Sequence, residues 1–238
     1  MKKNVLKKFA AAALAAATVM SSMSVMAFAA DAATGTEEKG SVTITKYMGD
    51  TQDYETLETH YGAEQTLVPG EKLQNVKFAY IEVGDRVQVE VDENGTRTTE
   101  MLYTLNKQAA KALEINDADV TEDTNMYYRM STLDTAIRKH KNEVIDLVKK
   151  ANNNHATPTG AEGTVKFEGL SLEKLYLFAE IDASGATKTD GTTPVAVTKV
   201  SVPFFVSLPF TGKDGTTVKD IYAYPKNSTG NVLSLIHI

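Results

Sequence analysis

Short runs of apolar and β-branched residues, each closed by a turn signal, recur along most of this chain and limit the folds open to it. Residues 41–47 alternate so that Val42, Ile44 and Lys46 share one face, as in a half-buried strand. Gly, Pro, Asn and Asp punctuate the runs, for example at 93–95 and 213–215. Many short strands with frequent turns are typical of a β-sandwich. Further strands are predicted at 76–83, 87–91, 164–167, 175–181, 195–200, 204–208 and 218–224.

Two stretches break the pattern and predict helices. The first covers 106–115, and the second runs from Ser131, the expected N-cap, to about residue 152. Apolar residues of the second stretch recur at helical spacing and form one stripe. The stripe comprises Leu133, Ile137, Val144, Leu147, Val148 and Ala151. We expect it to pack on the sheet, and a partner-binding helix is the alternative. The predicted fold class is all-β, a sandwich with a helical insertion at about 106–152.

The N-terminus has the three parts of a secretory signal peptide. Four lysines precede an alanine-rich apolar stretch, and Ala27-Phe28-Ala29 supplies the small residues of a cleavage site. Serines dilute the apolar stretch, which disfavours the alternative of a retained membrane anchor. We expect residues 1–29 to be removed, 30–38 to form a flexible leader and 39–227 to form one domain of a secreted protein.

Composition disfavours several functional classes. The signal holds four of the 25 basic residues and none of the 31 acidic ones, so the remainder carries ten more acidic than basic residues. This excess argues against nucleic acid or an anionic membrane as a partner. Cysteine is absent, so an exported chain of this kind needs a good core or another crosslink.

No sequence pattern in the chain predicts an active site. The four histidines have no ligand spacing, and His140, among Arg138, Lys139 and Lys141, is expected to be solvated. A nucleotide-binding glycine loop, a GxSxG elbow and a Cys–His pair are all missing. We therefore predict no metal, no cofactor and no enzymatic activity on other molecules.

The tetrapeptide Tyr224-Pro225-Lys226-Asn227 follows the last strand-like run. Proline cannot donate to a sheet ladder, so it tends to mark a strand edge or end, where the next side chain stays accessible. This placement predicts that Lys226 is a presented nucleophile. An ordinary solvated surface lysine is the alternative.

A second possible reaction, the formation of an internal isopeptide bond, requires an amine, an amide and a carboxylic acid on neighbouring strands. The candidates are Lys46, Asn227 and Glu180. Burial favours the neutral forms of lysine and glutamic acid. A neutral Lys46 could attack the Asn227 carboxamide while protonated Glu180 polarises it, forming an isopeptide bond. Each residue also has an ordinary alternative: Lys46 could extend to the surface, Glu180 could face solvent, and Asn227 could be a turn residue.

Four segments, in order, resemble the N-terminal domain of the backbone pilins of Gram-positive bacteria, the Cna B-type, SpaA-like pilins that sortases assemble. The segments are KGSVTITKY, VKFEGLSLEKLYLFAE, VPFFVSLPFT and IYAYPKN, and the resemblance covers 39–227. The helical stretch is longer than a minimal sandwich of this kind requires.

The resemblance implies an Ig-like sandwich in a structural subunit of a covalently polymerised cell-wall pilus. Lys226 would be the acceptor that a pilus-specific sortase joins to the C-terminal threonine of the next subunit. Lys46, Glu180 and Asn227 match the family's internal isopeptide positions, although some members lack this bond. The implied partners are other pilin subunits, the sortase and host surface ligands, with no cofactor.

Two functional alternatives stay open. One is a Cna B-type adhesin that binds a host ligand and is never polymerised, and the other is a secreted hydrolase with a sandwich fold. No LPxTG-like signal or second apolar segment is present, so we expect 228–238 to be the truncated start of a next segment. Its last six residues, 233–238, are either a sequencing artefact or an ordinary apolar strand start.

Overall fold

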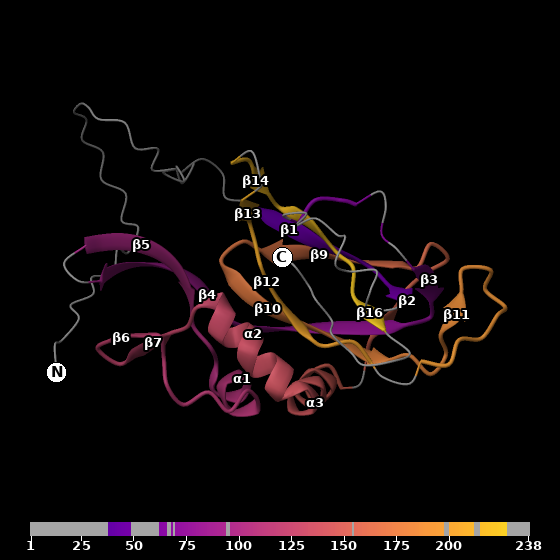
Figure 1. Cartoon of the computed structure of the whole chain (residues 1–238), viewed down its shortest axis with the longest axis horizontal. Coiled ribbons are helices and arrows are strands. Elements are labelled where there is room, and N and C mark those ends of the chain that lie inside the picture. Colours follow the sequence, from indigo (N-terminus) through magenta and orange to yellow (C-terminus); the bar gives the residue numbers. More distant parts are fainter. Residues whose placement is uncertain are drawn as a thin grey trace.

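The computed structural model of this chain describes residues 38–48, 62–65, 68, 70–93, 96–153, 155–197, 200–211 and 215–227, with the backbone alone at Glu93 and Asn227. The predicted signal peptide, all of the leader except Glu38, and residues 228–238 lie outside these ranges. Figure 1 shows an elongated arrangement, with the helices gathered along one side and the β4–β5 ribbon projecting at one end.

The first sheet joins the beginning and the end of the domain. Its order is β15-β1-β9, where β1 pairs antiparallel with β9 and parallel with β15. The parallel register sets Val42 opposite Ile221 and Ile44 opposite Ala223. The bounds are β1 Lys39–Thr45, β9 Thr164–Ser171 and β15 Asp220–Ala223.

The second sheet has the order β12-β10-β4-β5, and the short strand β8 also pairs with β4. Its strands are antiparallel. The bounds are β4 Lys77–Glu93, β5 Thr96–Tyr103, β8 Thr157–Pro158, β10 Lys174–Asp182 and β12 Phe204–Ser207.

Short strands extend this framework. One small sheet has the order β11-β3-β2-β16, and two hairpins are β6–β7 and β13–β14. The bounds are β2 Tyr47–Met48, β3 Glu71–Gln74, β11 Thr187–Lys188, β16 Lys226–Asn227, β6 Val120–Glu122, β7 Asn125–Tyr127, β13 Phe210–Thr211 and β14 Thr217–Val218.

The core lies between the two sheets because alternate residues of each point inward. Val42 and Ile44 of β1 pack in one buried cluster with Phe178 of β10 and Phe204 of β12. The Phe178 ring stacks on Phe204 with a centroid distance of 5.6 Å, and on Tyr80 at 5.1 Å. The predicted all-β, Ig-like sandwich is confirmed.

Strand β10 is covered on both faces. Tyr176 and Phe178 point into the sandwich, whereas Leu175 and Leu177 pack in a second cluster with the helices. Burial on both sides explains why this strand reads as an almost unbroken apolar run.

The helical insertion is confirmed, with corrections to its details. Helix α1 begins after Asn106, whose side chain accepts a 2.8 Å hydrogen bond from the Ala109 backbone N–H. The predicted Ser131 cap is wrong, because α2 is capped at Arg129 and contains Ser131 in its first turn. The second predicted helix is also broken in two at His140. The bounds are α1 Lys107–Ala112, α2 Met130–Lys139 and α3 Lys141–Ala151.

The break at His140 also corrects its expected environment. The backbone there departs from helical geometry, at φ −112° and ψ 36°, and the residue is only 8% exposed. His140 Nε2 lies 3.8 Å from Glu114 Oε2. The predicted solvation of this histidine is therefore wrong. The apolar stripe packs on the sheet as expected through Leu133, Val144 and their neighbours, but Ala151 at its end is exposed.

Two strand predictions differ from the structure. The runs 76–83 and 87–91 form one strand, β4, which pairs first with β10 and then with β5. Gly84 lies at this change of partner, where a Cβ atom would fall 1.8 Å from the Thr104 carbonyl oxygen. The predicted strand 195–200 is absent in its described part, because Val195 packs in the sandwich and Val200 against the helical cluster.

Candidate functional site

Lys46 lies between β1 and β2 at the edge of the sandwich. Its backbone N–H donates to the Gly163 carbonyl and its own carbonyl accepts from the Leu73 N–H, both at 2.9 Å. The side chain has the inward parity of Val42 and Ile44 and is 0% exposed. The structure thus rules out the surface alternative for Lys46.

Glu180 faces Lys46 from the opposite sheet. It has the inward parity of Tyr176 and Phe178 in β10 and is also 0% exposed, so the solvent-facing alternative is wrong. Its Oε2 accepts a 2.7 Å hydrogen bond from Lys46 Nζ. The prediction of neighbouring strands needs correction here, because the acid comes from the facing sheet.

Ser201 completes the surroundings of the acid. Its backbone N–H and its hydroxyl both donate to Glu180 Oε2, at 3.0 and 2.6 Å. Ser201 is buried in the segment between β11 and β12, and no sequence pattern marked it. The nearest signal was the predicted strand 195–200. It ended at Val200, next to Ser201, but Val200 does not lie in a strand.

Burial lowers the pKa of the Lys46 amine, and Glu180 opposes this shift through its charge and its hydrogen bond. Lys141 adds a smaller lowering of the same pKa. Lys141 opens α3, and its ammonium donates to the Val200 carbonyl next to Ser201. The 2.7 Å contact places Lys46 Nζ and Glu180 Oε2 close enough for direct transfer of a proton between them.

Asn227 reaches this edge through β16. Strand β16 pairs parallel with β2, which sets Lys226 opposite Tyr47 and Asn227 opposite Met48. The pairing continues the β1–β15 register, so Asn227 shares the strand parity of Ala223, which is buried in the sandwich core. Lys46 and Asn227 are therefore two residues apart along adjacent parallel strands.

Lys226 is not presented at the rim. Its side chain is 2% exposed, so the predicted accessible nucleophile and the solvated alternative are both wrong in this conformation. Proline does interrupt the strand, because β15 ends at Ala223, but pairing resumes at Lys226 in β16. The inference from proline failed because the segment after it joins another sheet.

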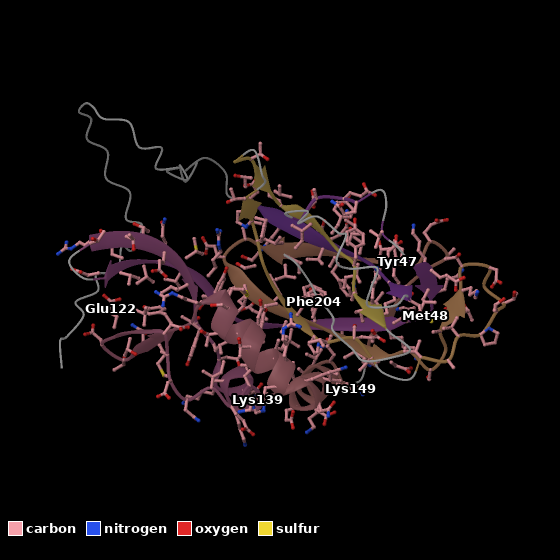
Figure 2. All side chains as sticks on the ribbon, viewed as in Figure 1. Tyr47, Met48, Glu122, Lys139, Lys149 and Phe204 are labelled. Carbon is pink, nitrogen blue, oxygen red and sulfur yellow. The ribbon has the colours of Figure 1, made fainter. Side chains whose placement is uncertain are left out.

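Neighbouring aromatic residues close this edge. The Tyr47 N–H donates to the Pro225 carbonyl at 3.2 Å, and the Tyr47 and Tyr224 rings meet edge to face at 6.2 Å. The Tyr224 hydroxyl in turn accepts a 2.6 Å hydrogen bond from the Gln65 N–H. Figure 2 shows Tyr47 and Met48 at this end of the molecule, far along the long axis from Glu122 on β6.

Within the described ranges, no three His, Asp or Glu side chains gather in a way that could hold a metal ion. Nor does any helix there have the length and apolar character needed to cross a bilayer.

Residues 37–228 match the family described as Gram-positive pilin subunit D1, N-terminal domain. The chain belongs to this family, which confirms the resemblance drawn from the four sequence segments. The comparison with curated proteins gives no significant match.

Several solved pilin structures are distantly similar. The full-length major pilin SpaD from Corynebacterium diphtheriae is 20% identical, with a TM-score of 0.37, covering 80% of this chain and 32% of that one. The N-terminal domain of shaft pilin SpaA from Lactobacillus rhamnosus GG is 17% identical, with a TM-score of 0.37. The match covers 83% of this chain and 100% of that one. This chain thus spans about a third of the full-length SpaD pilin, and the family assignment rests on the family match.

Replacing Ser201 tests the support of the buried acid. In an Asn227→Ala background, which cannot form the predicted crosslink, Ser201→Ala should lower the free energy of unfolding by about 2 kcal/mol, because a buried carboxylate loses a donor. Urea denaturation measures the change. Ser131→Ala, at an exposed position in α2, should stay within about 0.5 kcal/mol of its parent. Equal effects of the two substitutions would contradict the assignment.

Amine labelling tests the enclosure of Lys226. An acylating reagent followed by peptide mass analysis should modify Lys226 at least about tenfold more slowly than Lys166, because a buried amine reacts only through local opening. The Lys166 side chain is 51% exposed and serves as the matched control. Similar rates at both lysines would show that the edge opens freely.

Proposed function

We propose that this domain belongs to a structural subunit of a covalently assembled pilus, secreted and held at the cell wall. The observation that carries the proposal is a fully buried Lys46–Glu180 pair placed beside the last strand of a pilin N-terminal domain. In this view the domain acts on itself and on other pilin subunits, and it is not an enzyme for external substrates.

Within this proposal, Lys46 and Asn227 form an internal isopeptide bond. The neutral Lys46 amine attacks the carboxamide carbon of Asn227, a new C–N bond forms, and the amide nitrogen leaves as ammonia. Glu180 takes the proton of Lys46, polarises the carboxamide and returns a proton to the leaving group. The three hydrogen bonds to Glu180 Oε2 support this role, because they hold the acid in one position.

The strand register supports the reach of the reaction. Adjacent strands lie about 4.8 Å apart, and two residues along a strand span about 6.6 Å, so the two Cα atoms are roughly 8 Å apart. A lysine and an asparagine side chain together can bridge that distance. Lys46 Nζ also lies 6.0 Å from the centre of the Phe78 ring, which keeps water away from the amine.

Intact mass measurement tests the bond. The mature protein should weigh about 17 Da less than its calculated mass, because one ammonia leaves. Lys46→Ala should restore the full mass, whereas Lys166→Ala, at an exposed lysine, should keep the deficit. Glu180→Gln should abolish or greatly slow the loss, and an unchanged deficit in that variant would remove Glu180 from the mechanism.

We further propose that Lys226 is the acceptor for sortase-mediated joining to the next subunit. Its burial adds a requirement, because a transferase cannot reach an amine that is 2% exposed. The two-residue pairing of β16 with β2, or the groups that enclose Lys226, must therefore open before transfer.

Polymerisation of the full-length subunit with its sortase tests this role. Lys226→Arg keeps the charge but removes the nucleophile, so the ladder of high-molecular-weight products should vanish, while Lys166→Arg should leave it intact. Gel electrophoresis of cell-wall extracts gives the readout. A ladder that persists in Lys226→Arg would place the junction at another lysine.

The burial of Lys226 favours one rival, a Cna B-type adhesin that is never polymerised. An adhesin would show no ladder in the unsubstituted protein, and Lys226→Arg would leave its surface display unchanged.

A further inference from the structure

A cavity of about 570 Å³ opens between α2, the base of the β4–β5 ribbon and strand β12. Its volume falls in the range that protein ligand sites occupy. Phe204, which lines it, lies near the middle of the molecule, away from Tyr47 at the Lys226 end (Figure 2). The cavity is therefore separate from the site of the proposed crosslink.

Apolar side chains form most of its wall. They come from elements distant in the sequence, which meet here because α2 lies against β12. The apolar lining includes Met101, Met130, Ile137, Val206, Phe210 and Ile221.

Arg86 gives the cavity an uncompensated charge. Burial lowers the pKa of Arg86, and the charge interaction with Tyr103 raises it. Tyr103 also lines the cavity. Among the described residues no carboxylate forms an ion pair with Arg86, whereas Arg129 nearby is paired with Glu100 at 2.9 Å. A partly buried guanidinium without an acid is costly unless a ligand supplies one.

The remaining charges of the wall largely cancel. Arg138 lies one helical turn after Asp134 in α2, and the two interact. Two arginines and one aspartate leave a net positive cavity in a chain whose residues after 29 carry an acidic excess. Charge complementarity therefore favours an anionic occupant with an apolar body.

We propose that this cavity binds a peptide segment of a partner protein in which an apolar side chain stands next to a carboxylate. The carboxylate meets Arg86, and the apolar side chain packs between α2 and β12. Because well-packed contacts leave few voids, a single small acid would leave much of the 570 Å³ empty, whereas about two or three linked residues would fill it. The proposal is independent of the crosslink and of polymerisation.

Two matched peptides test the charge requirement. The probes are acetyl-Ala-Leu-Phe-Glu-Ala-amide and the same peptide with Gln in place of Glu, titrated into isotope-labelled mature protein and followed by NMR. The acidic peptide should shift the resonances of the cavity residues and bind at least about tenfold more tightly, the usual effect of one hydrogen bond to a charged group. Equal binding of the two peptides, or no shifts up to about 5 mM, overturns the proposal.

Variants assign the effect to the cavity. Arg86→Gln should weaken the acidic peptide about tenfold, whereas Arg97→Gln, on the same ribbon with a 63% exposed side chain, should not change its binding. Asp134→Asn should tighten binding, because it removes the opposing charge, and a purely structural role of Arg86 predicts no such gain. Weakening by Asp134→Asn, or equal effects of the two arginine substitutions, contradicts the proposal.

A third probe separates the peptide from a small acid. Phenylpropionate offers a ring and one carboxylate without a peptide backbone, and it should bind more weakly than the acidic peptide. Equal or tighter binding of phenylpropionate would make the cavity a small-molecule site and overturn the assignment to a protein partner.

Discussion

The buried ion pair between Lys46 and Glu180 is the constraint around which the sandwich is arranged. Withdrawing two charges from water costs several kcal/mol for each ion, and their attraction offsets this only when the remaining hydrogen bonds are made. Ser201 makes two of them, and Lys141 holds the carbonyl beside Ser201. A pair of apolar residues of similar volume would stabilise such a core at least as well. Stability alone therefore does not account for the pair, which is consistent with the isopeptide chemistry proposed for it.

Two lysines share this edge with opposite strand parity. Lys46 has the parity of Val42 and points to Glu180, while Lys226 has the parity of Tyr222 and Tyr224. Alternation thus separates the amine proposed for the internal bond from the amine proposed for assembly. The alternation also explains why the two lysines are buried by different surroundings. Lys46 is buried in the core, and Lys226 is buried at the edge that Tyr47 and Tyr224 help to close.

Periodicity predicted the parts of the fold that face the core. The alternation of 41–47 placed Lys46 inward, and the helical stripe with Leu133 packs on the sheet. Strand β5 was not predicted, because most of its residues are exposed and its sequence shows no apolar alternation. Ser201 and the burial of Lys226 depend on contacts between segments far apart in the sequence, which no local pattern encodes.

The parallel pairing of β1 with β15 has a mechanical consequence. The chain enters the sandwich at Lys39 and leaves β16 after Asn227, so a pull on these two points acts at opposite ends of the ladder. The strands must then slide past each other, and the hydrogen bonds share the load in shear, whereas an antiparallel hairpin pulled at its open end peels apart one bond at a time. Resistance to extension therefore follows from the topology itself, before any covalent tie is considered.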